Sequence, residues 1–192
     1  MAQLRGKVQL GISNRHIHLT TEHLSTLFGE GYDLTKIKDL SQPGQFACDE
    51  TVIIVGRKGA IPGVRVLGPI RKETQVEISR TDSFALGVRP PIRDSGQLDG
   101  SPGIVVVGPK GAINLNKGVI IAKRHIHMTP KDAANFGVED KQIVTVKVGG
   151  DRALTFDEVL IRVRDDFSLE LHLDTDEANA AAVSNGDWAE VY

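Results

Sequence analysis

Residues 15–18 read Arg-His-Ile-His, and residues 124–127 repeat the same four residues. Alternate residues of a β-strand project from the same side, so each segment presents two imidazoles together and turns its isoleucine to the other side. The likeness extends beyond the four residues to the stretches 7–24 and 117–134, each of which runs from an apolar strand to a short polar and apolar helix. A single His-x-His pair is common by chance, but two copies in matching contexts indicate an internal duplication.

Short runs of alternating apolar and polar residues predict β-strands in much of the remaining chain. These runs cover residues 75–79, 143–148, 159–164 and 168–173. Two similar glycine-bearing turns, at 55–61 and 107–113, predict hairpins. Helices are expected only at 23–28, 131–136 and 177–183, and Thr20 or Thr21 and Thr129 are suited to cap the first two.

The sequence therefore predicts a mostly β protein of two related small β-barrel domains with short helices. The duplication places these domains at residues 1–95 and 96–192. Segment 88–103, which is rich in proline and glycine, is the expected linker.

Composition excludes several classes of function. The chain has 192 residues with 23 basic and 25 acidic side chains, so no basic excess favours nucleic acid or a membrane surface. Its apolar runs are of strand length and too short to cross a bilayer. Cys48 is the single cysteine, which excludes an internal disulfide and suits the cytoplasm. We expect Cys48 to be inert rather than nucleophilic.

The two His-x-His pairs are suited to bind zinc, because neutral imidazoles at this spacing can converge on one ion. Two ligands are too few, so each pair needs a third from another strand. His172, between two leucines, is either that ligand or a buried histidine with ordinary hydrogen bonds. Glu77, between Val76 and Ile78, is either a ligand or a solvent-facing carboxylate. Structural zinc sites usually have four protein ligands, often cysteines, so three ligands without cysteine favour an open, catalytic site.

Arginine supplies the second part of the predicted chemistry. Arg71 precedes Glu77 by six residues, and its planar guanidinium can bind phosphate at two points. Segment 89–96 ends in Ser95-Gly96, which offers a hydroxyl and an unobstructed amide to an oxyanion. The same segment also reads as an ordinary solvated loop. No P-loop or Gly-x-Gly-x-x-Gly motif is present.

In combination, these segments resemble the phosphate propanoyltransferases, a family of phosphotransacylases. The resemblance rests on the two Arg-His-Ile-His segments, on Gln-Pro-Gly-Gln-Phe-Ala-Cys-Asp-Glu-Thr at 42–51, on Leu-Gly-Pro-Ile-Arg at 67–71 and on Gln-Val-Glu at 75–77, and it covers nearly the whole chain. It implies two β-barrels with the active site and two Zn²⁺ ions between them. It also implies an enzyme that interconverts an acyl-CoA and phosphate with an acyl phosphate and coenzyme A.

The resemblance assigns roles residue by residue. One zinc would be held by His16, His18 and Glu77, and the other by His125, His127 and His172. Arg71 would hold phosphate with Ser95 nearby, and coenzyme A would lie along Ser13, Lys38, Phe84 and Met128. Neither acetyl-CoA nor propanoyl-CoA is favoured, since one methylene is worth only about 1–3 kcal/mol in a pocket.

Two other functions are compatible with the same residues: a dinuclear zinc hydrolase, and a non-catalytic zinc-stabilised binding protein. The expected partners are the small-molecule substrates, with neither nucleic acid nor membrane, and the sequence is compatible with a homo-oligomer. Members of the family in bacterial microcompartments usually carry a targeting extension, whereas fifteen residues precede His16. The sequence thus predicts a freestanding cytoplasmic enzyme, or one in the microcompartment lumen if an extension has been removed.

Overall fold

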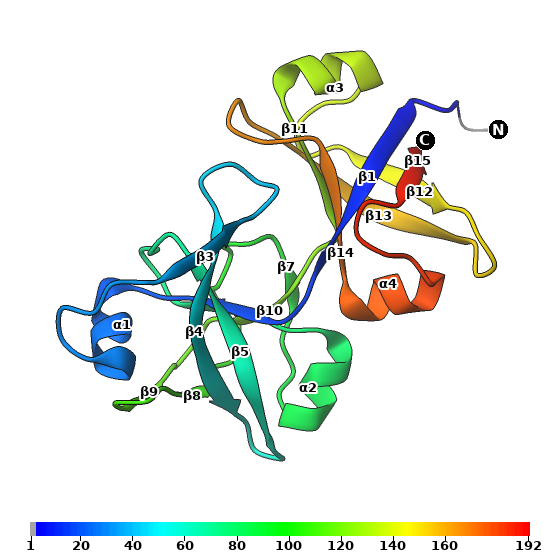
Figure 1. Ribbon diagram of the computed structural model, residues 1–192. Helices are drawn as coiled ribbons and strands as arrows, with labels where there is room; N and C mark the ends of the chain where they lie inside the picture. Colours follow the sequence, from blue (N-terminus) through cyan, green and yellow to red (C-terminus); the bar gives the residue numbers. More distant parts are fainter. Residues whose placement is uncertain (1–2) are drawn as a thin grey trace. The chain divides into compact units, whose positions relative to one another are not determined.

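A computed structural model describes residues 3–192 and divides the chain into two compact units (Figure 1). We call them the barrel unit, which contains the chain up to Asn14, Ser41–Pro43 and Lys123–Tyr192, and the sheet unit, which contains Arg15–Leu40 and Gly44–Ala122. The division differs from the one expected after residue 95, because that position and the whole segment 88–103 lie inside the sheet unit.

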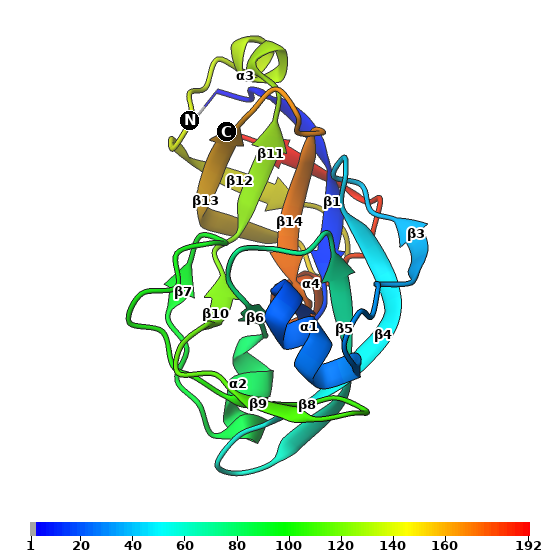
Figure 2. The ribbon, with the colours of Figure 1, turned by 90° about the vertical axis from the view of Figure 1, so that its left-hand side faces the viewer.

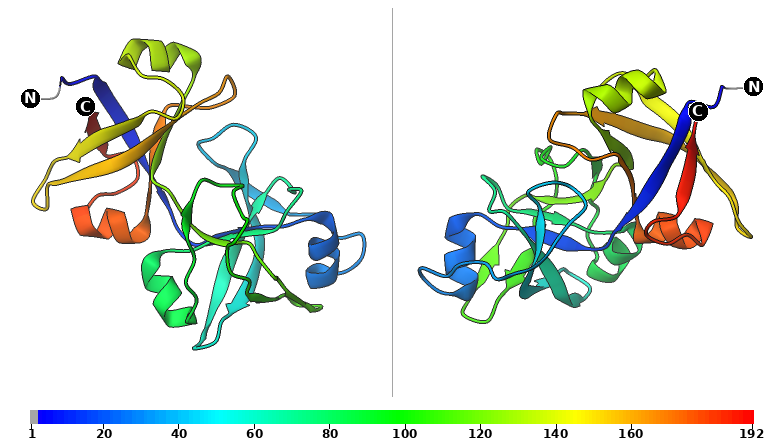
Figure 3. Two further views of the ribbon diagram at one scale, coloured as in Figure 1. Left: turned by 180° about the vertical axis from the view of Figure 1, so that it is seen from behind. Right: turned by 45° about the horizontal axis from the view of Figure 1, so that its top comes forward.

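The barrel unit is a closed barrel of six strands. Around the barrel their order is β1 (Gly6–Ser13), β14 (Glu170–Asp174), β11 (His125–Met128), β13 (Leu154–Val163), β12 (Ile143–Val148) and β15 (Trp188–Val191). The N-terminal strand β1 runs beside the C-terminal strand β15, as the right-hand view of Figure 3 shows. Figure 2 looks onto β13, β11, β14 and β1. Helices α3 (Pro130–Phe136) and α4 (Thr175–Ala181) complete this unit.

The sheet unit contains a nine-stranded sheet. Its main order is β7 (Ile92–Arg93), β10 (Val119–Ala122), β6 (Gln75–Glu77), β2 (His16–His18), β5 (Ala60–Gly68), β4 (Phe46–Val55), β8 (Val105–Val107) and β9 (Ala112–Asn114), and β3 (Lys36–Asp39) pairs with β4. Helices α1 (Thr21–Phe28) and α2 (Arg80–Leu86) belong to it. The prediction of a mostly β fold is confirmed, although the described strands close into a barrel only in the barrel unit.

The duplication seen in the sequence reappears in the strand pairing. Each His-x-His strand lies between an antiparallel and a parallel neighbour: β2 between β6 and β5, and β11 between β14 and β13. The strand that precedes each His-x-His pair joins the sheet of the other copy, since β1 pairs with β14 and β10 pairs with β6. A cut at residue 95 therefore cannot separate the two units.

Local signals explain most helix boundaries. Thr20 caps α1 and Thr129 caps α3, as the sequence predicts. Helix α2 was not expected from the sequence. The run 75–79 predicts one strand, but β6 ends at Glu77, and Ser79 forms a capping box with Asp82 that begins α2. Among the described residues, no helix is both long and apolar enough to cross a membrane.

Candidate active site

The pairing register brings a third ligand to each His-x-His pair. On the antiparallel neighbour, Glu77 lies directly opposite His16, and His172 lies directly opposite His125. Opposite residues of an antiparallel pair project from the same side of the sheet, within reach of one another. In each resulting cluster, the three candidate ligand atoms lie within 4.8 Å of one another. Both sets named by the resemblance are thus brought together.

The sheet-unit cluster consists of His16, His18 and Glu77. His16 Nε2 lies 3.5 Å from Glu77 Oε2, close to the roughly 3.3–3.5 Å that separates two ligand atoms on one tetrahedral zinc. His18 Nδ1 lies 3.1 Å from the Leu67 carbonyl oxygen. Because a carbonyl only accepts, Nδ1 donates its proton there and leaves the Nε2 lone pair to a metal.

The barrel-unit cluster consists of His125, His127 and His172. His125 Nδ1 donates to the Lys123 carbonyl at 2.7 Å, which again leaves Nε2 to a metal. Both ring nitrogens of His127 are buried without a hydrogen-bond partner among the described residues. Phe167 stacks on the same ring at 4.1 Å between centroids and fixes its orientation. Because a buried, unpaired polar atom costs free energy, a metal held at one of these nitrogens would remove part of that cost.

Burial and neighbouring charges shift the pKa values toward the forms that bind metal. Burial, with help from the nearby His16 and Arg71 charges, lowers the pKa of His18 to about 3. Burial acts to raise the pKa of Glu77, but His16 and His18 outweigh it and hold that pKa below its usual range. Burial also lowers the pKa of His127 in the barrel-unit cluster. Neutral imidazole and ionised carboxylate are the ligand forms of these side chains, so the residues of both clusters fit a Zn²⁺ ion.

The arginine of each Arg-His-Ile-His segment anchors its strand to a helix. Arg15 forms a two-point ion pair with Asp82, at 2.8 and 2.9 Å. Arg124 Nε lies 2.8 Å from Glu177. Both carboxylates belong to capping boxes of helices that follow the third-ligand strands. The repeated arginine therefore ties each His-x-His strand to the strand that supplies its third ligand.

Arg71 lies beside the sheet-unit cluster in a polar network. Its backbone amide donates to the Leu19 carbonyl at 2.9 Å, and its guanidinium donates to Ser95 Oγ at 3.1 Å. Gln75 Nε2 lies 2.8 Å from the same oxygen and 2.5 Å from Glu77 Oε1. Arg71 and Ser95, the two residues expected from the sequence to be catalytic, are thus linked through Gln75 to the candidate metal ligand Glu77.

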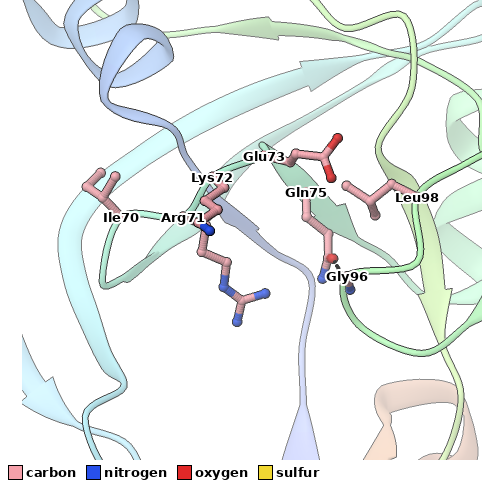
Figure 4. A pocket seen from close by; sticks show the side chains of 7 residues that line it. All are labelled: Ile70, Arg71, Lys72, Glu73, Gln75, Gly96 and Leu98. Carbon is pink, nitrogen blue, oxygen red and sulfur yellow. Dashed lines mark hydrogen bonds between the residues drawn. The ribbon is translucent and has the colours of Figure 1, made fainter.

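A cavity of about 350 Å³ opens beside this network. Figure 4 shows Arg71 and Gln75 among the residues that line it, with Gly96 hydrogen-bonded to the Gln75 side chain. Ile70 and Leu98 contribute apolar surface to the same cavity. Lys72 and Glu73 also line the cavity, so its lining combines two cationic groups and one carboxylate with amide groups and apolar surface.

The four residues expected to contact coenzyme A lie in different settings. Ser13 is half-buried at the end of β1, Lys38 is exposed on β3, and Phe84 is 65% exposed on α2. Met128 is fully buried in the core of the barrel unit, and its carbonyl accepts a hydrogen bond from the Arg164 amide, so neither its side chain nor its backbone is exposed to a ligand. The Cys48 thiol is buried, and burial raises its pKa to about 11, as expected for a residue that is not a nucleophile.

Two polar residues at the clusters were not singled out from the sequence. Gln75 contacts Glu77, and Glu170 lies 2.6 Å from His172 Nε2. Each stands two residues before a third ligand, so the strand period placed it on the same face. This two-residue spacing is the sequence signal by which Gln75 and Glu170 could have been identified.

Comparison with known proteins shows the family to which the chain belongs. Residues 9–184 match the phosphate propanoyltransferase family. A protein of Thermotoga maritima named phosphate propanoyltransferase is 69% identical over 179 residues, which cover 93% of this chain and 85% of the relative. A Clostridioides difficile protein of the same name is 55% identical over 184 residues, covering 96% and 88%. The matched stretch contains both candidate metal clusters and every segment that carried the resemblance, and the chain belongs to the phosphate propanoyltransferase family.

Proposed function

We propose that this enzyme interconverts a short-chain acyl-CoA and phosphate with an acyl phosphate and free coenzyme A. The observation that carries the proposal is the hydrogen-bonded connection from Arg71 through Ser95 and Gln75 to Glu77. It joins an anion-binding side chain to a metal cluster. The names of the relatives support propanoyl-CoA as a substrate, and acetyl-CoA is proposed as an alternative acyl donor.

In this proposal the guanidinium of Arg71 binds phosphate by its planar fork and orients one oxygen toward the thioester carbonyl. The Ser95 hydroxyl and the Gly96 region add further polar contacts. The phosphate oxygen forms a bond to the carbonyl carbon, the carbon–sulfur bond breaks, and coenzyme A leaves as the thiolate. Holding both reactants replaces a bimolecular collision by reaction within one complex, which does not require an acyl-enzyme.

We propose two Zn²⁺ ions per chain, one held by His16, His18 and Glu77 and one by His125, His127 and His172. A zinc ion with an open position supplies a Lewis acid that can polarise the thioester carbonyl or stabilise the sulfur of the leaving thiolate. Coenzyme A is proposed to contact the accessible side chains Ser13, Lys38 and Phe84, and the full burial of Met128 does not support a contact there.

The decisive experiment measures coenzyme A release from propanoyl-CoA and acetyl-CoA, with and without phosphate, on chelated and zinc-restored protein. The proposal expects release only with phosphate and zinc together, and an acyl phosphate product that hydroxylamine traps. Release without phosphate would identify a zinc hydrolase instead. Zinc binding without any release would identify a non-catalytic binding protein.

A further inference from the structure

Gln75 and Glu170 occupy equivalent positions in the two units. Each stands two residues before a third ligand, and each lies directly opposite the second histidine of a His-x-His pair: Gln75 opposite His18, and Glu170 opposite His127. Two residues of different chemistry therefore fill the same place in a duplicated arrangement.

The contact of Glu170 with His172 is a hydrogen bond rather than shared metal ligation. Glu170 Oε2 lies 2.6 Å from His172 Nε2, whereas two ligands of one tetrahedral zinc are about 3.3 Å apart. A carboxylate at this distance accepts the Nε2 proton. This hydrogen bond leaves the Nδ1 lone pair of His172 as the one available to a metal, and the rings of His125 and His127 lie 5.0 and 4.7 Å away between centroids.

Gln75 makes the opposite contact in the sheet unit. Its Nε2 donates to Glu77 Oε1 at 2.5 Å, which leaves Glu77 Oε2 near His16. An imidazole ligand carries a proton that needs an acceptor, and a carboxylate ligand has a second oxygen that needs a donor. The carboxylate of Glu170 and the amide of Gln75 meet these two needs, so each residue matches the ligand beside it.

The Glu170 carboxylate is itself held in place. It accepts a hydrogen bond from Ser41 Oγ, and the Gln42 amide lies 3.5 Å away. Gly11 lies against the carboxylate from β1, where a Cβ would stand only 2.7 Å from its carboxyl carbon. Glycine at this position leaves the space that the carboxylate fills.

We propose that Glu170 is a positioning residue for a metal in the barrel unit, which holds His172 so that Nδ1 is the ligand, and that Gln75 orients Glu77 in the sheet unit. The inference rests on the two metal clusters of the proposed function. Its tests concern metal binding alone, so they stand or fail separately from acyl transfer.

The first test measures two-site zinc affinity by chelator competition. Glu170→Ala should weaken one zinc equivalent about 10–100-fold, the usual cost of losing such an outer partner, and leave the other unchanged. Glu170→Gln, whose amide oxygen can still accept the proton, should recover part of the loss. Glu139→Ala removes an exposed carboxylate from the same unit and should match the parent protein. Two unchanged affinities in Glu170→Ala, or equal weakening of both, would overturn the proposal.

The second test needs no substitution. Nitrogen-15 NMR of the imidazoles in the zinc-loaded protein should show His172 protonated at Nε2 and bound through Nδ1. His18 and His125 should show the reverse, with the proton on Nδ1. A His172 bound to zinc through Nε2 would overturn the assignment.

Discussion

The two metal clusters have the same strand geometry but different surroundings. In the sheet unit the third candidate ligand is the carboxylate of Glu77, and a network connects it to Arg71. In the barrel unit the third candidate ligand is the imidazole of His172, and the aromatic ring of Phe167 stacks on His127. The sheet-unit cluster thus contains a carboxylate among its candidate ligands, whereas in the barrel unit the nearest carboxylate, that of Glu170, contacts the imidazole of His172.

The neighbouring arginines differ as well. Arg71 donates to the neutral oxygens of Ser95 and, at 3.5 Å, Gln45. Arg164, near the barrel-unit cluster, forms a two-point ion pair with Asp166 at 2.7 and 2.9 Å. Guanidinium charge compensated by a carboxylate binds a second anion less well. The two clusters thus share a strand arrangement, and the hydrogen bonds of Arg71 to the Ser95 and Gln75 network are the reason why we propose phosphate binding in the sheet unit.

Removing one histidine from either metal cluster should have the largest effect on metal content and activity. We expect His18→Ala and His127→Ala each to lose one of two zinc equivalents and to retain the other, because the clusters draw their ligands from separate sheets. Activity should fall by more than the ~10–100-fold that loss of an outer partner costs. Metal analysis after gel filtration, together with a coenzyme A release assay, measures both effects. Loss of both metals from either variant would show that the sites are not independent.

Arg71→Ala should separate phosphate binding from metal binding. We expect activity to fall about 100–1000-fold, as on removal of a group that stabilises transition-state charge, with zinc content unchanged. Arg71→Lys should recover only part, because an ammonium lacks the planar fork. Arg93→Ala, at an exposed position of the same unit, serves as the control. Full activity of Arg71→Ala across phosphate concentrations would contradict the assigned role.

The two anchoring ion pairs should differ in their contribution to stability. Asp82 has a side chain only 5% exposed, whereas that of Glu177 is 20% exposed. Arg15→Ala leaves the more deeply buried carboxylate and should destabilise by about 2–3 kcal/mol, whereas Arg124→Ala should cost about 1 kcal/mol. Urea unfolding of metal-free protein measures both values, with Arg164→Ala in a 61% exposed pair as the control. Equal losses in the two variants would contradict the burial argument.

The strands, hairpins and helix caps that depend on local residue spacing could be predicted from the sequence. The His-x-His strands, strand 143–148, both hairpins and the caps at Thr20 and Thr129 follow from strand and helix periods or from single capping residues. The pairing of β1 with β14 and of β10 with β6 was not predictable. Each of these strands pairs with a strand from the other copy of the duplication, and such pairing depends on residues far apart in the sequence. Glu77 and His172 stayed ambiguous for the same reason: only the register sets them opposite a histidine.

Ser95→Ala should have the smallest effect on the sheet-unit network. The variant removes the oxygen to which both Arg71 and Gln75 donate, but leaves the guanidinium and Glu77 in place. A single hydrogen bond contributes about 0.5–1.5 kcal/mol, so activity should fall about 2–12-fold. Because Arg71 would lose one of its fixed partners, the loss should appear mainly as a higher KM for phosphate, with zinc content unchanged. Steady-state kinetics at varied phosphate, beside Ser101→Ala as a control in the same unit, distinguish this from general destabilisation. A drop in kcat at constant KM would instead assign the hydroxyl to the transition state.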